Sequence, residues 1–513
     1  MDTLEQTQWI ELCKLHAHEE QLSDVCIQVL RAFGSTATQE PSAPNFQQLQ
    51  ENCATQLGLL PGQIVATLDG EIDKDQAQLF SRRFQSVIEL LEKQAAMFQE
   101  AVLLKTGLII RTHQILHAPG PRALRVRAVV DFYYTQAAII HHRPEDPSLV
   151  QNYQTLIDQT PWQALGNGAS WKKVEGLTQF GPIYVNVLKL TQSRIRAVDC
   201  RTHASGLSLE DFSAAQNALA AVSGGFFLYS EPDIQPPSVR TDPVSFLMDQ
   251  GTIYNPPVLC RATLMQTQSG AISISRVGPE GLRFRWENGP LLRVESHNKK
   301  SDAAVRSFNR AFGRVAPAGP TNVAIVGNTV VSVSTSELEI PLAGMIVSLT
   351  GIDAPEPGTP IRWLGYERFD HDPLHTAMAG GPLLLEQGAI CINREVEDFQ
   401  ESAPPVTFSQ DETFDQNLLP RMAAGLNEAG ALFFAAIDGR NFHQAPGMTL
   451  KQTAEWMKAL GCHRAMNLDG GSSKRMVVNQ KVVDLSSTEV VGTKAGKESI
   501  RPVHSAILID AES

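Results

Sequence analysis

The sequence lacks the features that mark a membrane protein or a protein of an oxidising compartment. No uninterrupted apolar run approaches the roughly 18 residues that a transmembrane helix needs. The N-terminus, 1–6, is acidic and has neither the basic start nor the apolar run of a signal peptide. The seven cysteines are odd in number, scattered and without C-x-x-C spacing, which argues against a zinc site and a disulfide framework. We therefore expect a reduced, cytoplasmic protein with no membrane partner.

An excess of positive charge is missing as well. The 43 Lys and Arg residues are outnumbered by 55 Asp and Glu residues, and the net charge of −12 is spread along the chain. This balance argues against a nucleic-acid partner. The G-x-S-x-G signature of acyl-enzyme hydrolases is absent too. What is present is the composition of a globular protein, 42% hydrophobic and 19% charged, over 513 residues, a length that predicts roughly two or three domains.

The first part of the chain, 1–165, has helical periodicity. Its clearest segment is 74–104, where apolar residues recur at steps of three and four, and 122–141 repeats the pattern. Prolines and the run Gly166-Asn167-Gly168 punctuate the end of this part. We predict an all-α N-terminal region at 1–165 and a second domain at 170–513. The role of the helical region is unknown, and self-association is one hypothesis for it.

The second domain carries several strand signals. Alternation of apolar and polar residues predicts a strand at 183–190, and an almost wholly apolar run predicts a buried strand at 431–437. The dipeptides Gly327-Asn328 and Asn479-Gln480 each separate two apolar runs, as hairpin turns do.

Two helices are expected among these strands. One covers 209–221, with Ser208 as its N-cap. The other follows Thr449, and Gln452 at its N3 position completes a capping box. Gly461 is placed to end that second helix.

The strand that follows breaks into a turn of small residues, Asn467-Leu468-Asp469-Gly470-Gly471-Ser472-Ser473. Asn467 and Asp469 flank Leu468, so in a strand both point to the face opposite it. Two adjacent glycines permit positive φ and leave room for a ligand. Successive N–H groups of such a turn can converge on an anion. By themselves these residues fit either a ligand site or an ordinary polar turn.

Further motifs accompany this turn in a fixed order. They are Ser223-Gly224-Gly225-Phe226-Phe227, Gly380-Gly381-Pro382-Leu383-Leu384, Ala436-Ile437-Asp438-Gly439-Arg440, Gly447-Met448-Thr449-Leu450 and Arg501-Pro502-Val503. With them, the chain from about 175 to 510 resembles the phosphodiester glycosidase family. The resemblance implies an α+β fold with a mixed sheet for this domain. Ser223 and Ser505 stand where Asn is common in the family, and Ser472 shortens the glycine run.

The resemblance implies hydrolysis of a sugar linked through its anomeric carbon to a phosphodiester, by way of an oxocarbenium-like state. Asp469 and Asp438 are the implied catalytic carboxylates. A planar guanidinium can bind two phosphate oxygens, and the candidates for this contact are Arg421, Arg440 and Arg501. The other substrate-binding candidates are Asn467, Gly224, Gly225, Gly380, Gly381, Gly470, Gly471, Ser472 and Ser473.

Several roles stay open for these side chains. The arginines can instead pair with Asp438 or Asp469 and hold loops together, and Asp438-Gly439 also suits a plain turn. Either aspartate could ligate a divalent ion, Ca²⁺ or Mg²⁺, and no other cofactor is indicated. His504 could donate a proton or be structural.

The functional prediction is a hydrolase of bacterial carbohydrate metabolism that acts on a glycosyl-1-phosphodiester, with a phosphorylated sugar or glycan as substrate. The alternative is a module of the same fold that binds phosphorylated sugars or glycans with weak or no turnover. Ser223 and Ser472 keep this alternative open, since they depart from the family's pattern. At Ser505, a serine has a shorter reach than an asparagine and lacks its amide donors.

Overall fold

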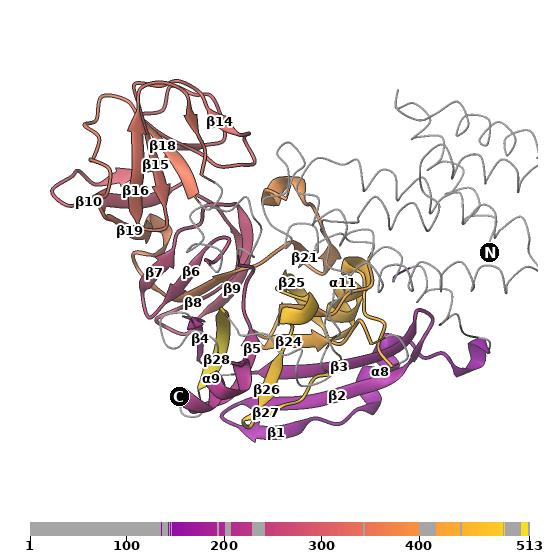
Figure 1. Ribbon diagram of the computed structural model, residues 1–513. Coiled ribbons are helices and arrows are strands. Elements are labelled where there is room, and N and C mark those ends of the chain that lie inside the picture. Colours follow the sequence, from indigo (N-terminus) through magenta and orange to yellow (C-terminus); the bar gives the residue numbers. More distant parts are fainter. Residues whose placement is uncertain are drawn as a thin grey trace, which may run out of the picture. The chain divides into compact units, whose positions relative to one another are not determined.

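The computed structural model describes residues 135, 142, 144, 146–191, 194–200, 207–227, 242–341, 344–399, 417–441, 444–485, 487 and 504–510. The chain divides into two compact units, one formed by 1–143 with 490–493 and the other by 144–489 with 494–513. Nearly all of both predicted helical segments, 74–104 and 122–141, lies outside the described residues. The helices and strands named below all belong to the second unit (Figure 1).

Antiparallel sheets dominate the described residues, so the prediction of an α+β fold with a mixed sheet is wrong. Within the described ranges only β12 (Ser296–His297) and β13 (Val305–Phe308) pair in parallel. The α-helices there are few and short, namely α8 (Tyr153–Gln159), α9 (Leu209–Ala215) and α11 (Leu450–Ala459). Antiparallel neighbours can be joined by tight turns, whereas parallel neighbours need a long crossover that is usually helical.

The largest sheet has eight strands in the order β1-β2-β3-β24-β23-β25-β21-β22. Its strands are β1 (Gln163–Gly166), β2 (Ala169–Thr178), β3 (Gly181–Leu190), β21 (Leu383–Glu386), β22 (Ala389–Ile390), β23 (Arg421–Asn427), β24 (Leu432–Ile437) and β25 (Cys462–Leu468). Strands β3 and β24 confirm the two strands predicted at 183–190 and 431–437, and they pair with each other. The sheet thus joins segments that are far apart in the sequence.

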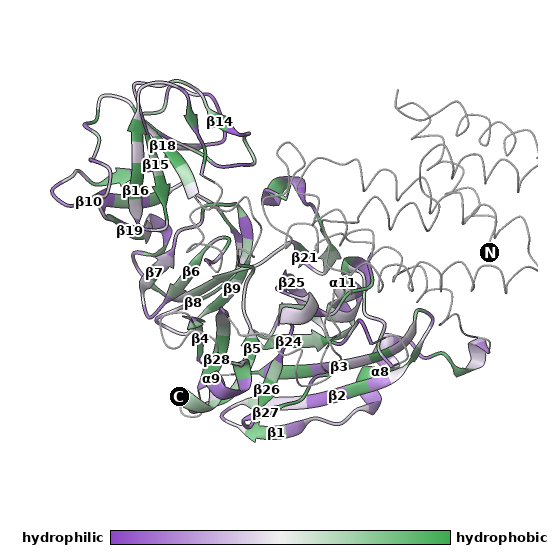
Figure 2. Ribbon diagram, in the orientation of Figure 1, coloured by the Kyte–Doolittle hydropathy of each residue, from purple (hydrophilic) through white to green (hydrophobic). Residues whose placement is uncertain are grey.

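Both faces of this sheet are buried at its central strand β24. Along β24, Leu432, Phe434 and Ala436 belong to one apolar core, and Phe433 and Ala435 belong to another. Successive side chains of a strand point to opposite faces, so a strand that is covered on both sides is apolar at every position. Figure 2 shows the hydrophobic character of β24.

Helices α8 and α11 contribute to the core that contains Phe433. The predicted capping box of α11 is confirmed. Thr449 Oγ1 accepts a hydrogen bond from the Gln452 N–H (3.1 Å), and Gln452 Oε1 accepts one from the Thr449 N–H (2.8 Å). The predicted end is confirmed as well, because Gly461 follows the helix with a φ of +84°. Trp456 is fully buried by this arrangement.

We expect Thr449→Ala to lower the free energy of unfolding by about 1 kcal/mol, because an uncapped N–H is left at the helix start. Thr449→Ser keeps the accepting oxygen and should cost clearly less. Urea denaturation followed by circular dichroism measures both variants. Equal stability of the alanine variant and the wild type would contradict this account of the cap.

A second sheet has the order β27-β26-β5-β28-β4. Its strands are β4 (Ile195–Asp199), β5 (Ala218–Ser223), β26 (Met476–Val478), β27 (Lys481–Val482) and β28 (Ser505–Asp510). The predicted hairpin turn at Asn479-Gln480 is confirmed between β26 and β27, with φ of 48° and 61° at its two residues. Two successive positive φ values suit a tight hairpin of this kind.

The helix predicted at 209–221 is shorter in the structure. Ser208 caps it as expected, by accepting from the Asp211 N–H (3.1 Å). The helix ends at Ala215, and Asn217 adopts a left-handed φ of 50°. The alanines that follow form the buried strand β5 between β26 and β28. Alanine suits a helix, so only the tertiary pairing reveals the strand.

The other sheets lie between these segments in sequence. One is formed by β6 (Leu247–Asp249), β7 (Thr252–Asn255), β8 (Arg261–Thr267), β9 (Ile272–Val277) and β20 (Leu374–Ala379), and another joins β12 and β13 to β15 (Thr321–Val326), β16 (Thr329–Ser334) and β18 (Gly344–Leu349). Smaller sheets contain β10 (Leu282–Trp286), β11 (Leu292–Arg293) and β19 (Ile361–Tyr366), and β14 (Val315–Ala316) with β17 (Leu338–Glu339). The predicted hairpin at Gly327-Asn328 joins β15 and β16 and is confirmed. In the part of the chain that the structure describes, no helix has the length and apolarity to cross a membrane.

Candidate active site

One pocket gathers the ends of several elements. Its walls come from the start of α9, the segment after β5, the turn after β25 with the 3₁₀ helix η7 (Gly471–Ser473), the residue before β26, and the start of β28. The lining residues are Ser208, Leu209, Glu210, Ser223, Gly224, Gly225, Phe227, Asp469, Ser472, Ser473, Arg475, Val482, His504 and Ser505.

The pocket brings together some of the predicted site residues and not others. Those in its lining are Asp469, Gly224, Gly225, Ser472 and Ser473. Those outside its lining are Asp438, Asn467, Arg421, Arg440, Gly380, Gly381, Gly470 and Gly471. Arg501 lies outside the described residues.

Gly224 and Gly225 let the chain pass close to neighbouring segments at the pocket wall. The Gly224 N–H donates to the Ser505 carbonyl oxygen (3.1 Å), and a Cβ on Gly224 would lie 2.5 Å from Ser505 Oγ. A Cβ on Gly225 would overlap the carbonyl oxygen of Ala379, at the end of β20. Close packing therefore requires glycine at both positions. The same two residues line the pocket, so their backbone faces it.

We expect Gly225→Ala to lower the free energy of unfolding by about 1–3 kcal/mol, because the Ala379 carbonyl is backbone and cannot turn aside as a side chain can. Gly176→Ala is a matched control, since its new methyl group would meet only the side chain of Leu156. Thermal and urea unfolding of both variants give the comparison. A Gly225→Ala variant as stable as the wild type would contradict the close approach.

Asp469 joins the two glycine motifs at the pocket. It follows β25 and is 5% exposed, and its N–H donates to the carbonyl oxygen of Gly224 (3.1 Å). After it the chain runs close to Pro420, whose carbonyl oxygen would lie 2.5 Å from a Cβ on Gly470. Gly471 then takes a left-handed φ of 58° and starts η7. The glycine turn thus carries the chain from Asp469 back into the pocket wall.

Asn467 lies outside the pocket lining and binds the motif that contains Gly380 and Gly381. Its Nδ2 donates to the Gly381 carbonyl oxygen (3.0 Å), and the Gly381 N–H donates to the Asn467 carbonyl oxygen (2.7 Å). A Cβ on Gly380 would overlap that same Asn467 oxygen. Asn467 therefore orients a loop, whereas the sequence analysis counted it among the substrate-binding candidates.

Arg475 supplies a buried guanidinium to the pocket, and the sequence analysis did not single it out. The residue is 5% exposed, and its backbone N–H donates to Ser223 Oγ (3.2 Å). Its Nη1 lies 3.7 Å from Asp484 Oδ2 and has no hydrogen-bond partner among the described residues.

Ser505 Oγ donates to the Gly225 carbonyl oxygen (3.4 Å), as Ser223 Oγ accepts from the Arg475 N–H. Two of the serines that depart from the family pattern thus bind backbone atoms of the pocket wall.

Asp438 belongs to a buried ion cluster. Lys474 Nζ donates to Asp438 Oδ1 and to Asp484 Oδ2, the latter over 2.7 Å, and all three side chains are at most 1% exposed. Burial raises the pKa of Asp438, Lys474 lowers it and Asp484 raises it again, so that the pKa stays above its ordinary value. The sequence suggested an arginine partner for this aspartate, and the partner is instead Lys474.

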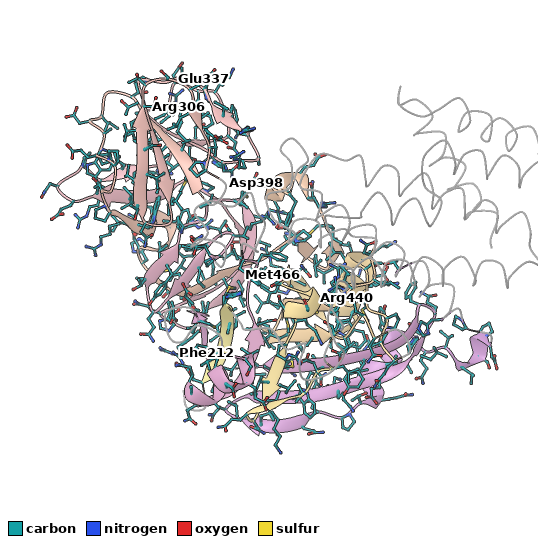
Figure 3. The ribbon with its side chains drawn as sticks, viewed as in Figure 1. Phe212, Arg306, Glu337, Asp398, Arg440 and Met466 are labelled. Carbon is teal, nitrogen blue, oxygen red and sulfur yellow. The ribbon has the colours of Figure 1, made fainter. Side chains whose placement is uncertain are left out.

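Arg421 and Arg440 are buried and do not belong to the pocket lining. Arg440 is labelled in Figure 3. Arg421 Nε donates to the Met448 carbonyl oxygen (3.0 Å), and its Nη2 donates to the Asn417 carbonyl oxygen (2.9 Å). Arg440 has a left-handed φ of 53°. These contacts of Arg421 with carbonyl oxygens hold loops together, whereas the structural alternative for the arginines proposed the same role through Asp438 or Asp469.

The ion cluster of Asp438, Lys474 and Asp484 also limits where the predicted divalent cation could bind. Within the described ranges, no group of three or more His, Cys, Asp or Glu side chains is placed to hold a metal ion. The ammonium of Lys474 stands between the carboxylates of Asp438 and Asp484, where a metal ion would have to bind. That pair of aspartates therefore does not fit a Ca²⁺ or Mg²⁺ site. A cation at Asp469 stays a prediction.

Glu210 and His504 complete the polar lining. Glu210 is exposed and lies in the first turn of α9, and the His504 ring meets Phe227 edge-on with ring centroids 4.3 Å apart. In the sequence Glu210 looks like part of an ordinary helix start, and Arg475 like the residue before an ordinary strand. The two basic residues that follow a turn suited to anions, Lys474 and Arg475, are the signal that could have drawn attention to Arg475.

Comparison with known proteins agrees with the motif-based resemblance. Residues 309–510 match the family model described as phosphodiester glycosidase, so the resemblance is confirmed for that part of the chain. The match begins after the Gly224-Gly225 motif. This part of the chain therefore resembles a domain of the phosphodiester glycosidase type. No curated protein matches the chain.

The solved structures that are similar to the chain include the following three. A hypothetical protein from Synechocystis has 19% identity and a TM-score of 0.44, over 68% of this chain and 63% of its own. A putative exported protein from Burkholderia pseudomallei has 20% identity and a TM-score of 0.41, over 65% and 75%. The catalytic domain of zebrafish N-acetylglucosamine-1-phosphodiester alpha-N-acetylglucosaminidase, auto-inhibited by its pro-peptide, has 14% identity and a TM-score of 0.39, over 72% and 95%. The chain thus spans 63% of the length of the first of these.

Proposed function

We propose that the protein hydrolyses a glycosyl-1-phosphodiester and that the pocket around Asp469 and Arg475 is its active site. The observation that carries the proposal is the pairing, in one pocket, of a mostly buried carboxylate with a mostly buried guanidinium. Such a substrate needs a cation for its phosphate and a carboxylate for the sugar centre, which becomes positive as the leaving group departs.

Arg475 is the proposed phosphate ligand. A guanidinium presents its donors in a planar fork that matches two phosphate oxygens. Nη1 of Arg475 is buried without a hydrogen-bond partner among the described residues, so it has a donor to offer an anion. This assignment replaces Arg421, whose Nε and Nη2 donate to carbonyl oxygens. The backbone of the Gly224-Gly225 and Ser472-Ser473 segments would form the rest of the phosphate-binding site.

Asp469 is the proposed catalytic carboxylate, and it would act as nucleophile or as electrostatic partner of the oxocarbenium-like centre. Glycosidases generally use two carboxyl groups. Glu210, at the rim of the same pocket, is the proposed second one, and His504 is the other side chain of the lining that can exchange a proton. Asp438 is not proposed for this role because Lys474 binds it.

The alternative function is binding of phosphorylated sugars or glycans without turnover. One observation favours it: Asp438, the second carboxylate that the family motifs indicate, is engaged by Lys474 and does not line the pocket. A requirement for a divalent cation, a cytoplasmic location and self-association stay predictions from the sequence.

Turnover and binding can be separated with the full-length protein. The first measurement is sugar release from a panel of aryl-linked and nucleotide-linked sugar-1-phosphodiesters. The second is calorimetric binding of the same compounds. Sugar release that scales with enzyme concentration supports the hydrolase. Saturable binding without release of sugar from any of the compounds contradicts the hydrolase and supports the binding module.

A further inference from the structure

Asp484 contacts three consecutive residues that lead from the pocket into β26. Its Oδ2 accepts from Lys474 Nζ (2.7 Å) and lies 3.7 Å from Arg475 Nη1. Its Oδ1 accepts from the Met476 N–H (2.7 Å). The Asp484 side chain is fully buried, so these contacts are shielded from water and keep a defined geometry.

Lys474 anchors this carboxylate. An ammonium has three donors, and those of Lys474 bind Asp438 Oδ1, Asp484 Oδ2 and the Leu485 carbonyl oxygen (3.1 Å). Its donor capacity is used within the cluster, so Lys474 holds Asp484 in place and Arg475 is the neighbouring cation that faces the pocket.

The segment after β27 also reaches the glycine turn itself. Ser487 Oγ donates to the Gly471 carbonyl oxygen (3.4 Å), and the Leu485 N–H donates to Asp438 Oδ1 (3.1 Å). Ser487 and Asp484 thus bind the two ends of the run from Gly471 to Met476, which contains the pocket residues Ser472, Ser473 and Arg475.

We propose that Asp484 is a positioning residue that holds the Arg475 guanidinium in the orientation in which it binds the phosphate group of the substrate. The proposal rests on the proposed function, because it takes Arg475 as the anion ligand. Asp484 sits too far from Nη1 for a hydrogen bond, at 3.7 Å. It therefore orients the guanidinium by charge and leaves the Nη1 donor to the ligand.

Two possible roles of Asp484 predict opposite effects of Asp484→Asn on phosphate binding: its negative charge alone, and the orientation that it gives to Arg475. Loss of a nearby negative charge alone strengthens the binding of an anion. Loss of orientation weakens it, because the guanidinium must then be ordered on binding. Asparagine keeps the shape of the side chain and an oxygen for the Met476 N–H. The substitution therefore changes the charge with little change in volume.

A double-mutant cycle on the full-length protein tests the proposal, with inorganic phosphate as the probe in isothermal titration calorimetry. The four proteins are the wild type, Asp484→Asn, Arg475→Gln and the double variant. We expect Asp484→Asn to weaken phosphate binding about tenfold when Arg475 is present and by less than about twofold when it is Gln. An equal loss in both backgrounds, or a gain in affinity, overturns the positioning role.

Two controls keep the result interpretable. Asp398→Asn changes a carboxylate that accepts the Cys260 N–H (2.8 Å) and does not line the pocket, and it should leave phosphate affinity unchanged. If Asp484→Asn does not fold, Asp484→Glu takes its place in the cycle, with the same criterion. Unchanged phosphate affinity in Arg475→Gln would contradict the proposed anion site itself, whereas a large Arg475 effect without coupling to Asp484 would contradict the positioning role alone.

Discussion

Replacing Arg475 by glutamine is expected to lower kcat/KM for a sugar-1-phosphodiester by about 100-fold or more. The phosphate is the leaving group, and it gains negative charge as the bond to the sugar breaks. A charge-assisted hydrogen bond from the guanidinium therefore strengthens in the transition state, so kcat falls as well as affinity. Steady-state kinetics of sugar release measure this, and inhibition by inorganic phosphate should weaken in parallel.

Two further arginine variants serve as controls. Arg475→Lys keeps the charge but loses the planar fork, so its loss should be intermediate. Arg283→Gln removes a guanidinium that binds Asp370 on the surface and does not line the pocket, and it should behave as the wild type. An Arg475→Gln variant with wild-type kcat/KM would contradict the assignment of Arg475 to the phosphate.

Replacing Lys474 by methionine should lower the free energy of unfolding by about 3–5 kcal/mol, because it removes the cation that hydrogen-bonds two buried carboxylates. Asp438 and Asp484 are each at most 1% exposed on their side chains. Neither can turn to water without opening the loops that they hold. Urea denaturation near neutral pH measures the loss.

The loss should depend on pH in a defined direction. Lys474 lowers the pKa of Asp438, which burial and Asp484 hold above its ordinary value of 3.8. In Lys474→Met that pKa rises further, while the pKa in the unfolded chain does not change. The folded chain then binds more protons than the unfolded chain between these two values, so stability falls as pH rises through the window. The deficit should be larger at about pH 8 than at about pH 5.

Lys172→Met is the matched control for this prediction. Lys172 is also buried, but its ammonium donates to the carbonyl oxygens of Ile157 (2.6 Å) and Thr160 (3.4 Å) and not to a carboxylate. Its replacement strands no buried charge, so its stability deficit should vary little between those pH values. A deficit of Lys474→Met that is equally independent of pH would contradict the ion cluster.

Local chemistry made several elements predictable. A turn with two positive φ values at Asn479-Gln480, a capping box at Thr449 and an apolar run in β24 each follow from a few adjacent residues. The strand β5 could not be predicted from adjacent residues, because its alanines suit a helix equally well. Only pairing with β26 and β28 makes them a strand.

Interactions between distant residues account for what the sequence could not reveal about the site. Asp438 and Lys474 are 36 residues apart, and Ser223 and Arg475 are 252 residues apart. No periodicity links such positions. The motifs located Asp469 and Gly224-Gly225 in what proved to be one pocket. They did not distinguish Arg475, which binds at the pocket wall, from Arg421, which holds loops.

The fold class was wrong for a related reason. The mixed sheet was implied by the family resemblance, and the strand pattern did not reveal the error, because apolar strands covered on both faces, such as β24, are also typical of parallel sheets flanked by helices. Here the second face of the sheet is covered largely by another antiparallel sheet, since one core combines β24 residues with residues of β4, β5 and β28. A strand covered by another sheet and a strand covered by helices are both apolar at every position, so the sequence does not distinguish them.

The most direct test of the central claim is the rate of sugar release by the full-length protein, measured for the wild type and for Asp469→Asn on the same sugar-1-phosphodiester. Asparagine keeps the size of the side chain and removes its charge. We predict sugar release by the wild type and a loss of about 1,000-fold or more in kcat for the variant, with the variant still folded and still able to bind phosphate. A rate in Asp469→Asn within a few-fold of the wild type would contradict the account.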